Sequence, residues 1–302
     1  MSKKAWIGLM AASSCTNKII LLTFDVEDWF QVENFKEYIP YSSWGSKEVR
    51  VEKNTNELLD LLDSSSIPVR ATFFILGWIA KRYPDLVREI QKRGHEVASH
   101  GFDHHLCYNQ SLDDLRDDLL RSKELLEDLT GKQVLGYRAP SFSITDDALS
   151  LVGEVGYLYD SSFNSYEGHG RYGSLSLPQN TGQDAPIYSI NSSIYEIPMS
   201  NLRIGSKIIP WGGGGYFRLL PAFLHRFGVK RILEQKKCYT FYMHPWEIDP
   251  EQPRVKEAKS SFRFRHYVNL HKTKRKLKYF IESNSDNSFQ KCGDFVKSRS
   301  CL

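Results

Sequence analysis

Cysteine is scarce in this chain, and the few cysteines are scattered along it. The sequence has 302 residues and 5 cysteines, an odd number without a CxxC or other close pair. This distribution excludes a disulfide framework and a cysteine-based structural zinc site, and it is typical of a reducing compartment. We therefore expect a cytoplasmic location.

The chain also lacks a long hydrophobic run. The apolar stretch near the N-terminus, residues 5–12, follows Lys3 and Lys4 and is far too short to span a bilayer. We interpret residues 1–17 as an N-terminal extension. The alternative is a short signal peptide, which would place the protein in the periplasm or cell envelope.

A strong net charge is absent as well. The chain has 40 Lys and Arg against 36 Asp and Glu, a formal charge of +4, and we expect no nucleic-acid partner from so small an excess. The basic residues gather in one region, because residues 252–282 hold 10 Lys and Arg but only 2 acids. One interpretation of this cluster is a solvated helix face. An equally good one is a peripheral contact of residues 263–278 with a membrane or an anionic glycan.

What the chain does contain is a regular alternation of strand-like and helix-like segments. Seven apolar runs predict strands, at residues 19–24, 71–76, 95–99, 134–137, 157–159, 195–199 and 239–243. Amphipathic patterns predict helices at residues 54–62, 78–93, 111–130, 146–154, 221–236 and 270–282. The alternation predicts an α/β fold with a parallel sheet, open or closed as a barrel. A long loop that borders the functional site is expected at residues 164–193.

Polar side chains stand at the C-terminal ends of five of these strands. They are Asp25, Glu27 and Asp28 after the first strand, His100, His104 and His105 after the third, and Arg138, Asp160 and His244 after three later strands. In parallel α/β folds that edge of the sheet carries the active site. We therefore expect these side chains to converge.

The residue types predict a metal centre. His100 and His104, in HGFDH, are four residues apart, and a carboxylate from the end of the first strand would complete a His, His, acid set. Such a set suits catalytic zinc or another borderline divalent metal. The competing interpretations are an exposed histidine pair and an acidic loop that caps the next helix.

Three further residues suit acid–base chemistry. His244 is the natural general acid opposite Asp25. Arg138, in YRAPSF, would hold a base carboxylate in its ionised form, and Asp160, in YDSSF, would orient an imidazole. A buried histidine, a surface arginine and a helix N-cap are the structural alternatives.

Taken in order, these motifs resemble those of the polysaccharide deacetylases with the NodB homology domain, carbohydrate esterase family four. The matching motifs are TFDVED, SHGFDHH, YRAPSF, YDSSF and FYMHPWEIDPEQPR, and the resemblance covers about residues 18–282. GGGGYFRLLP and FRFRHYVNL resemble segments of the branch found in exopolysaccharide and exosortase-linked gene clusters. The resemblance implies a distorted seven-stranded (β/α) barrel. It also implies metal-dependent removal of N-acetyl groups from the amino sugars of a cell-surface or extracellular polysaccharide, or of its lipid-linked precursor.

The resemblance assigns roles to the polar residues. Asp25 would be the catalytic base and Arg138 would orient it. His244 would protonate the leaving amine, and Asp160 would tune His244. His100 and His104 would bind the divalent metal ion, for which we expect zinc.

The chain departs from the family pattern at one position. The family has a second aspartate directly after the base, where this chain has Val26. The metal carboxylate must then come from Glu27 or Asp28. We favour Glu27, because residues 25 and 27 of an extended strand point the same way.

Aromatic residues near strand ends are candidates for stacking on sugar rings. We name Tyr137, Phe142, Trp211 and Trp246 as substrate contacts, with a backbone N–H near Tyr137 or in residues 138–142 as an oxyanion donor. Barrel packing is expected to explain at least half of the chain's strand-end aromatics.

The sequence patterns divide the chain into four parts. The boundaries are an extension at 1–17, a barrel at 18–250, a basic segment packed on it at 251–282 and a flexible tail at 283–302.

One alternative function is hydrolysis of another non-peptide C–N bond, as in a cyclic ureide or a formyl-amino sugar. The other is a catalytically silent glycan-binding module, which the missing second aspartate favours.

Overall fold

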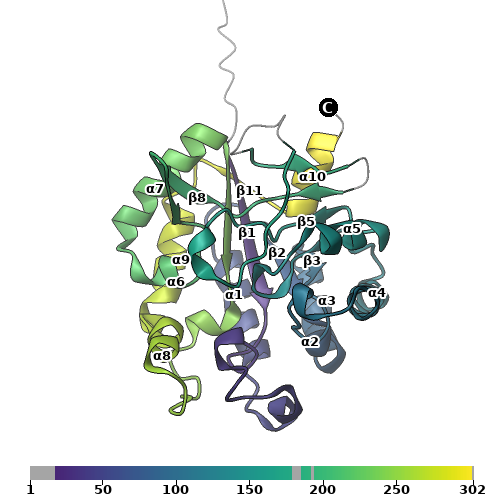
Figure 1. Ribbon diagram of the computed structural model, residues 1–302. Helices are drawn as coiled ribbons and strands as arrows, with labels where there is room; N and C mark the ends of the chain where they lie inside the picture. The colour runs from purple at the N-terminus through teal and green to yellow at the C-terminus, as the bar shows by residue number, and fades with distance from the viewer. Residues whose placement is uncertain (1–17, 179–184, 192–193, 301–302) are drawn as a thin grey trace, which may run out of the picture.

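Seven parallel strands form a curled sheet at the centre of the molecule (Figure 1). The computed structural model describes residues 18–178, 185–191 and 194–300, so the predicted extension at 1–17 lies outside the described residues. Across the sheet the strands are β10 (Cys238–Met243), β1 (Ile19–Val26), β2 (Thr72–Ile75), β3 (Glu96–Ser99), β4 (Gly136–Tyr137), β5 (Tyr159–Asp160) and β7 (Tyr195–Glu196). These are the seven strands that the sequence predicts, and the α/β fold with a parallel sheet is confirmed.

The sheet is a half-barrel that stays open on one side. β6 (Tyr188–Ser189) pairs antiparallel with β7, and within the described ranges no ladder joins either of them to β10. A short parallel bridge from Gly213 to Tyr242 covers the outer edge of β10 instead. β8 (Asn201–Ile204) and β9 (Lys207–Pro210) form a separate hairpin, which the sequence patterns did not indicate.

The central strand β1 explains how acids reach the interior. Its sequence, IILLTFDV, is buried at all 8 positions, and it pairs with β10 and β2. Continuous apolar runs of this kind belong to strands covered on both faces. Because the run ends in acids, Asp25 and Glu27 are delivered to the C-terminal edge of the sheet.

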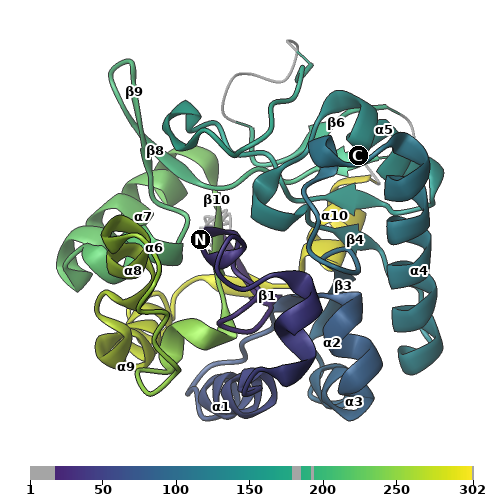
Figure 2. The same ribbon diagram turned by 60° about the horizontal axis from the view of Figure 1, so that its bottom comes forward.

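Helices wrap the outside of the sheet (Figure 2). They are α1 (Val51–Asp63), α2 (Gly77–Arg82), α3 (Pro84–Lys92), α4 (Leu112–Thr130), α5 (Asp146–Glu154), α6 (Gly214–Leu219), α7 (Ala222–Lys236), α8 (Ser260–Tyr267), α9 (Leu270–Glu282) and α10 (Cys292–Ser300). The single helix predicted at 78–93 is divided at Pro84, which has no N–H to continue the ladder. The long helix α4 begins as predicted, with the Ser111 hydroxyl accepting from the Asp114 N–H, and ends at Gly131 in the left-handed region.

The predicted flexible tail at 283–302 is wrong for most of its length. β11 (Ser288–Gln290) pairs with Ile19–Leu21 of β1, at the end of that strand where β2 has not yet begun. α10 then buries Cys292, Phe295 and Val296, whose i, i+3, i+4 spacing makes one apolar face. An open strand edge and a short apolar face together hold this segment, although most of its residues are polar.

Candidate metal centre and acid–base site

A cleft of about 400 Å³ opens at the C-terminal edge of the sheet. It is lined by Asp25 near the end of β1, Glu27 just after that strand, His100 and His104 from the loop after β3, and His244 after β10. Of the polar residues predicted to converge, these five line the cleft, and Arg138 lies behind Asp25. They meet because each follows a parallel strand at the same edge of the sheet.

Glu27, His100 and His104 form the arrangement expected of a metal centre. One ligand atom from each lies within 4.8 Å of the others, and all three residues are buried. Glu27 Oε2 is 2.9 Å from His104 Nε2, yet it has no hydrogen-bond partner among the residues described. A buried carboxylate oxygen that faces two imidazoles without a hydrogen bond fits a divalent cation.

Neighbouring groups keep these three residues ready to bind a cation. Burial opposes ionisation of Glu27, but the imidazoles around it outweigh burial and lower its pKa to about 2. Burial lowers the pKa of His100 to about 4, which keeps its ring neutral. The Nδ1 of His100 lies 2.7 Å from the Arg138 carbonyl oxygen, so the Nε2 is left for a ligand. His104 has φ 57°, a rare value for a non-glycine residue and one that clusters at functional sites.

Asp28, the alternative carboxylate, is turned away from the cleft. Its Oδ2 accepts from the backbone N–H groups of Arg50 and Val51 at 2.6 and 2.9 Å, and its Oδ1 accepts from Trp29 at 2.8 Å. Asp28 therefore caps the start of α1. The carboxylate that approaches the histidines is that of Glu27.

Arg138 lies against Asp25, as the sequence predicts. Its Nη1 donates to Asp25 Oδ1 at 2.7 Å, and the guanidinium is fully buried. Further bonds to Thr23 Oγ1, the Ser161 carbonyl and Ser161 Oγ fix it in place. This charge-assisted pair orients the Asp25 carboxylate in the cleft.

His244 stands between the two carboxylates. Its Nε2 lies 3.9 Å from Asp25 Oδ2 and 3.4 Å from Glu27 Oε1. Burial lowers the pKa of His244, but Glu27, Glu247 and Asp25 more than offset burial and raise it to about 9. The ring is therefore cationic at neutral pH and able to donate a proton.

The group that orients His244 is Glu247, which the sequence reasoning missed. Glu247 Oε1 is 2.8 Å from His244 Nδ1, and Glu247 Oε2 accepts from Arg218 Nε at 2.6 Å. Arg218 is held in turn by the carbonyls of Arg265, His266 and Val268. The HPWE sequence indicates this contact, because in the turn Pro245–Ile248 the acid three residues after the histidine lies against the imidazole.

The prediction that Asp160 tunes His244 is wrong. Asp160 accepts from Ser162 Oγ at 2.7 Å and from the Ser162 N–H at 3.0 Å, so its carboxylate fixes its own turn. Burial raises the pKa of Asp160. Burial and the neighbouring Asp160 carboxylate together raise the pKa of the adjacent Glu196. The contribution of Asp160 to the site passes through Ser161, which this turn presents to Arg138.

Two of the four predicted aromatic contacts line the cleft and two do not. Phe142 and Trp246 line it, and Trp246 Nε1 donates to Glu27 Oε1 at 3.2 Å. Tyr137 is buried against Tyr157, and Trp211 is buried with its Nε1 donating to the His225 carbonyl. The last two are therefore packing residues.

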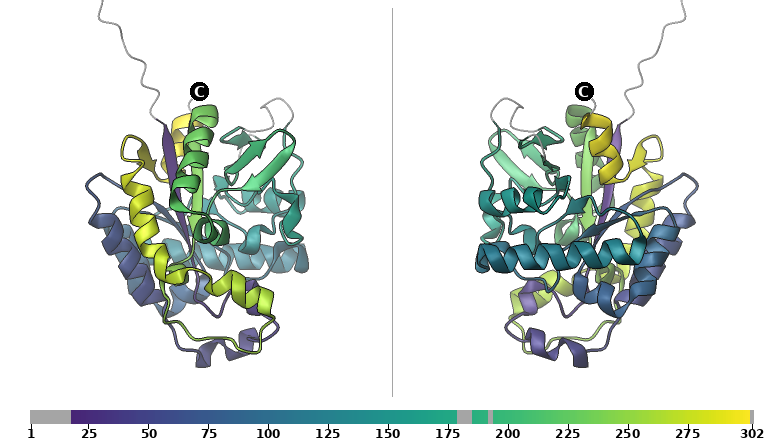
Figure 3. Two further views of the ribbon diagram at one scale, coloured as in Figure 1. Left: turned by 90° about the vertical axis from the view of Figure 1, so that its left-hand side faces the viewer. Right: turned by 90° about the vertical axis from the view of Figure 1, so that its right-hand side faces the viewer.

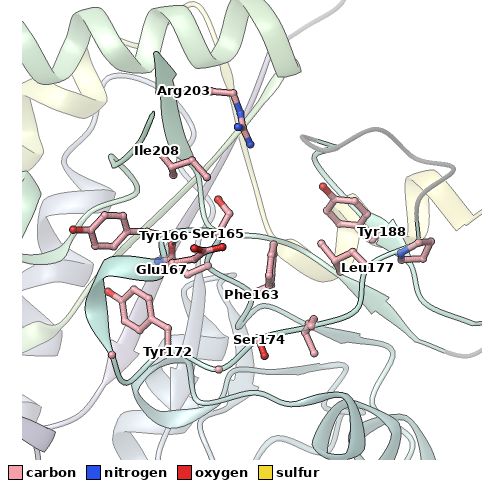
Figure 4. A pocket seen from close by; sticks show the side chains of 15 residues that line it. Phe163, Ser165, Tyr166, Glu167, Tyr172, Ser174, Leu177, Tyr188, Arg203 and Ile208 are labelled. Atoms are coloured by element: carbon pink, nitrogen blue, oxygen red, sulfur yellow. Dashed lines mark hydrogen bonds between the residues drawn. The ribbon is translucent and has the colours of Figure 1, made fainter. Parts of the chain in front are cut away.

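A second cavity, of about 860 Å³, shares lining residues with the cleft. Figure 4 shows the side chains around this second cavity. Its wall comes mainly from residues 163–178, with Tyr188 from β6 and Arg203 and Ile208 from the hairpin. Tyr166 and Tyr172 line both spaces, so the predicted long loop forms the partition between them.

Comparisons with known proteins agree with this site. The family model for polysaccharide deacetylase matches residues 13–159, and a model described as a domain of unknown function (DUF3473) matches residues 161–297. A peptidoglycan deacetylase-like protein of Gibberella zeae is 33% identical over 141 residues, 47% of this chain and 40% of that protein. A peptidoglycan-N-acetylglucosamine deacetylase of Bacillus cereus is 35% identical over 103 residues, 34% of this chain and 47% of that protein. The chain thus spans less than half the length of these relatives.

Solved structures share the fold at low sequence identity. A candidate polysaccharide deacetylase of Mycobacterium smegmatis has a TM-score of 0.59 at 19% identity, covering 94% of this chain and 90% of that one. The Puue allantoinase has a TM-score of 0.60 at 14% identity, covering 96% of this chain and 92% of that one.

Among the described residues, no helix combines the length and the apolar composition that a membrane span requires. On the matched domain and its site motifs, the chain belongs to the polysaccharide deacetylase family.

Proposed function

We propose that this protein is a metal-dependent hydrolase that removes N-acetyl groups from the amino sugars of a polysaccharide or oligosaccharide. One observation carries the proposal. A single cleft holds a Glu–His–His set, an arginine-held carboxylate and a further histidine, with Glu27 Oε1 and Asp25 Oδ2 within 4 Å of His244 Nε2. The deacetylases named above support the substrate class.

Each residue then has a chemical task. Glu27, His100 and His104 would hold a divalent ion, for which we propose zinc, and such an ion polarises a carbonyl and acidifies water. Asp25 takes the proton of the attacking water, and Arg138 holds its carboxylate in position. His244 gives a proton to the departing nitrogen, so that the C–N bond breaks to acetate and a free amine. Trp246 keeps the Glu27 carboxylate in place through its indole N–H.

Comparing two acids tests which of them serves His244. Glu247→Gln replaces the acceptor at Nδ1 with an amide and should lower kcat by at least about tenfold. Asp160→Asn keeps the turn at Ser162 and should leave kcat near that of the wild type. Acetate release from an N-acetylated oligosaccharide measures both, and thermal unfolding checks that each variant is folded. Equal losses in the two variants would contradict the assignment of Glu247.

The second cavity bears on the length of the substrate. It is lined by aromatic rings and polar groups, among them Phe163, Tyr188, Asn164 and Ser174, together with one acid, Glu167, and one base, Arg203 (Figure 4). Rings and hydrogen-bonding groups of this kind suit a sugar chain. We propose that sugars next to the one being deacetylated lie there.

Filling the second cavity should therefore penalise long substrates alone. Ser174 is exposed on the cavity wall, so Ser174→Trp places an indole in that space. We expect kcat/KM on a long oligosaccharide to fall about tenfold, with little change on a short one. Ser66→Trp, an exposed serine between α1 and β2, is the matched control. An equal effect on both lengths would refute the role of the cavity.

A substrate panel separates the alternative functions. A hydrolase of another C–N bond would release formate or a ring-opened product in place of acetate, and a glycan-binding module would retain its ligand and release nothing. The exopolysaccharide branch and the lipid-linked precursor are proposals that the same panel addresses. A cytoplasmic location stays a proposal too, supported by the buried, unpaired Cys107, Cys238 and Cys292.

The proposed peripheral contact through residues 263–278 rests on fewer charges than its composition suggests. Lys274 pairs with Glu57 at 2.9 Å, and Lys278 lies 3.9 Å from Glu282. Lys276 donates to the carbonyls of Phe217 and Leu220, and burial lowers its pKa to about 8. Much of this basic helix therefore serves the fold.

A further inference from the structure

Exposed apolar side chains gather on one side of the molecule. Ten large apolar residues are exposed in the described part of the chain, and seven belong to β8 and α6–α9: Ile204, Leu219, Phe223, Leu224, Phe227, Phe264 and Tyr279. Helix α7 packs against β8 and α9, and α6 packs against α9, on the side of the molecule that faces the viewer in Figure 3 (left). Monomeric proteins rarely keep such a concentration exposed unless it meets a partner.

Helix α7 provides the most exposed part of this side. Phe223 is 73% exposed and Phe227 is 61% exposed, and one helical turn separates them, so they lie on one face. The opposite face packs inward through buried residues that include Val229, Ile232 and Leu233. The outward aromatic face therefore takes no part in packing the core.

Basic residues flank this aromatic face. Arg226, Lys230 and Arg231 are exposed on the same side of α7. From residue 202 to residue 237 the chain has 8 Lys and Arg and one acid, Glu234, which lies 4.0 Å from Lys230. We call Phe223, Leu224, Phe227, Arg226, Lys230 and Arg231 the α7 surface.

The α7 surface begins at the rim of the cleft. Helix α6 lines the cleft with residues that include Tyr216 and Leu219, and the chain passes through Leu220 and Pro221 directly into α7. Phe264, which is 59% exposed, also lines the cleft. Whatever covers the α7 surface therefore lies next to the substrate entrance.

We propose that the α7 surface docks the protein on an anionic lipid bilayer. Phe223 and Phe227 enter the interface, while Arg226, Lys230 and Arg231 lie among the anionic headgroups, the pattern of an interfacial amphipathic helix. A second copy of the chain is disfavoured as occupant, because an isologous contact would bring the same basic residues face to face. Docking in this way sets the cleft at the membrane surface, and it does not depend on the chemistry proposed for the cleft.

Vesicle co-sedimentation tests the proposal. The full chain is mixed with phosphatidylcholine vesicles, with or without phosphatidylglycerol, and the bound fraction is measured at low and high salt. We expect binding to the anionic vesicles only, weakened by salt, and at least tenfold weaker in Phe223→Ser/Phe227→Ser. Arg226→Glu/Lys230→Glu should lose binding as well. Leu112→Ser, at a 55% exposed leucine on α4, is the control and should bind like the wild type.

Three outcomes would overturn the proposal. The wild type could bind neutral and anionic vesicles alike, or neither. The double serine variant could bind like the wild type. The wild type could also sediment as a dimer that the double serine variant dissociates, which would make this face a contact between copies. Acetate release from a soluble substrate should be unchanged in the α7 variants, which separates this test from that of the proposed function.

Discussion

Replacing Asp25 with asparagine should lower the rate of acetate release by about two to four orders of magnitude. The amide oxygen of the new side chain would still accept the hydrogen bond that Arg138 Nη1 donates to Asp25 Oδ1, so the site keeps its shape. What the amide cannot do is take a proton from water. The measurement is acetate and free amine released from an N-acetylated oligosaccharide by the purified variant.

Two controls make the Asp25→Asn result specific. The metal content of the variant should match that of the wild type, because the proposed ligands are Glu27, His100 and His104. Its thermal unfolding should also stay close to that of the wild type. A folded, metal-loaded variant with unchanged acetate release would show that Asp25 is not the base.

Replacing His244 with alanine should produce a loss that depends on the leaving group. On an N-acetyl amino sugar we expect about two to four orders of magnitude, because a departing amine needs the proton that His244 supplies. On 4-nitrophenyl acetate the loss should be much smaller, since a nitrophenolate leaves without protonation. The readouts are acetate release from the amide and nitrophenolate absorbance from the ester.

Asp25→Asn is the matched control for the His244→Ala experiment. Both substrates need an activated water, so the asparagine variant should lose activity on the amide and the ester alike. If His244→Ala reduced the two reactions equally, His244 would act on the attacking water or on the structure of the cleft, and the assignment of the general acid would be wrong.

The convergence of the polar residues was predictable because topology dictates it. Strands that run parallel end at one edge, so the acids of TFDVED and the histidines of SHGFDHH had to approach each other. The two-residue period of a strand also favoured Glu27, and the carboxylate of Asp28 caps α1 instead. Both predictions rest on local geometry that the sequence carries directly.

The partner of His244 was missed, although the i, i+3 spacing in HPWE carries its signal. Asp160 and Glu247 are both acids near strand ends, and only the tight turn after Met243 decides which one reaches the imidazole Nδ1. Trp211 and Trp246 pose the same difficulty. Each follows a strand, yet one is buried against His225 and the other lies over the cleft. For the two tryptophans, the choice depends on side-chain directions set by long-range packing.

The structure of the C-terminal segment was not predicted from the sequence, for a different reason. Polar composition suggested a loose tail, but Ser288–Gln290 completes an open edge of β1 that no sequence pattern reveals.

The division of the predicted helix at Pro84 was visible in the sequence, because proline cannot continue a helical ladder.

Metal dependence of acetate release tests the central claim most directly. The purified protein is assayed on an N-acetylated oligosaccharide as isolated, after removal of its metal by a chelator, and after zinc is added back, with Glu27→Gln in parallel. We predict acetate release that the chelator abolishes and zinc restores, and a Glu27→Gln variant that neither holds the ion nor responds to it. Acetate release that is indifferent to the chelator, or that survives in Glu27→Gln without bound metal, would contradict the account.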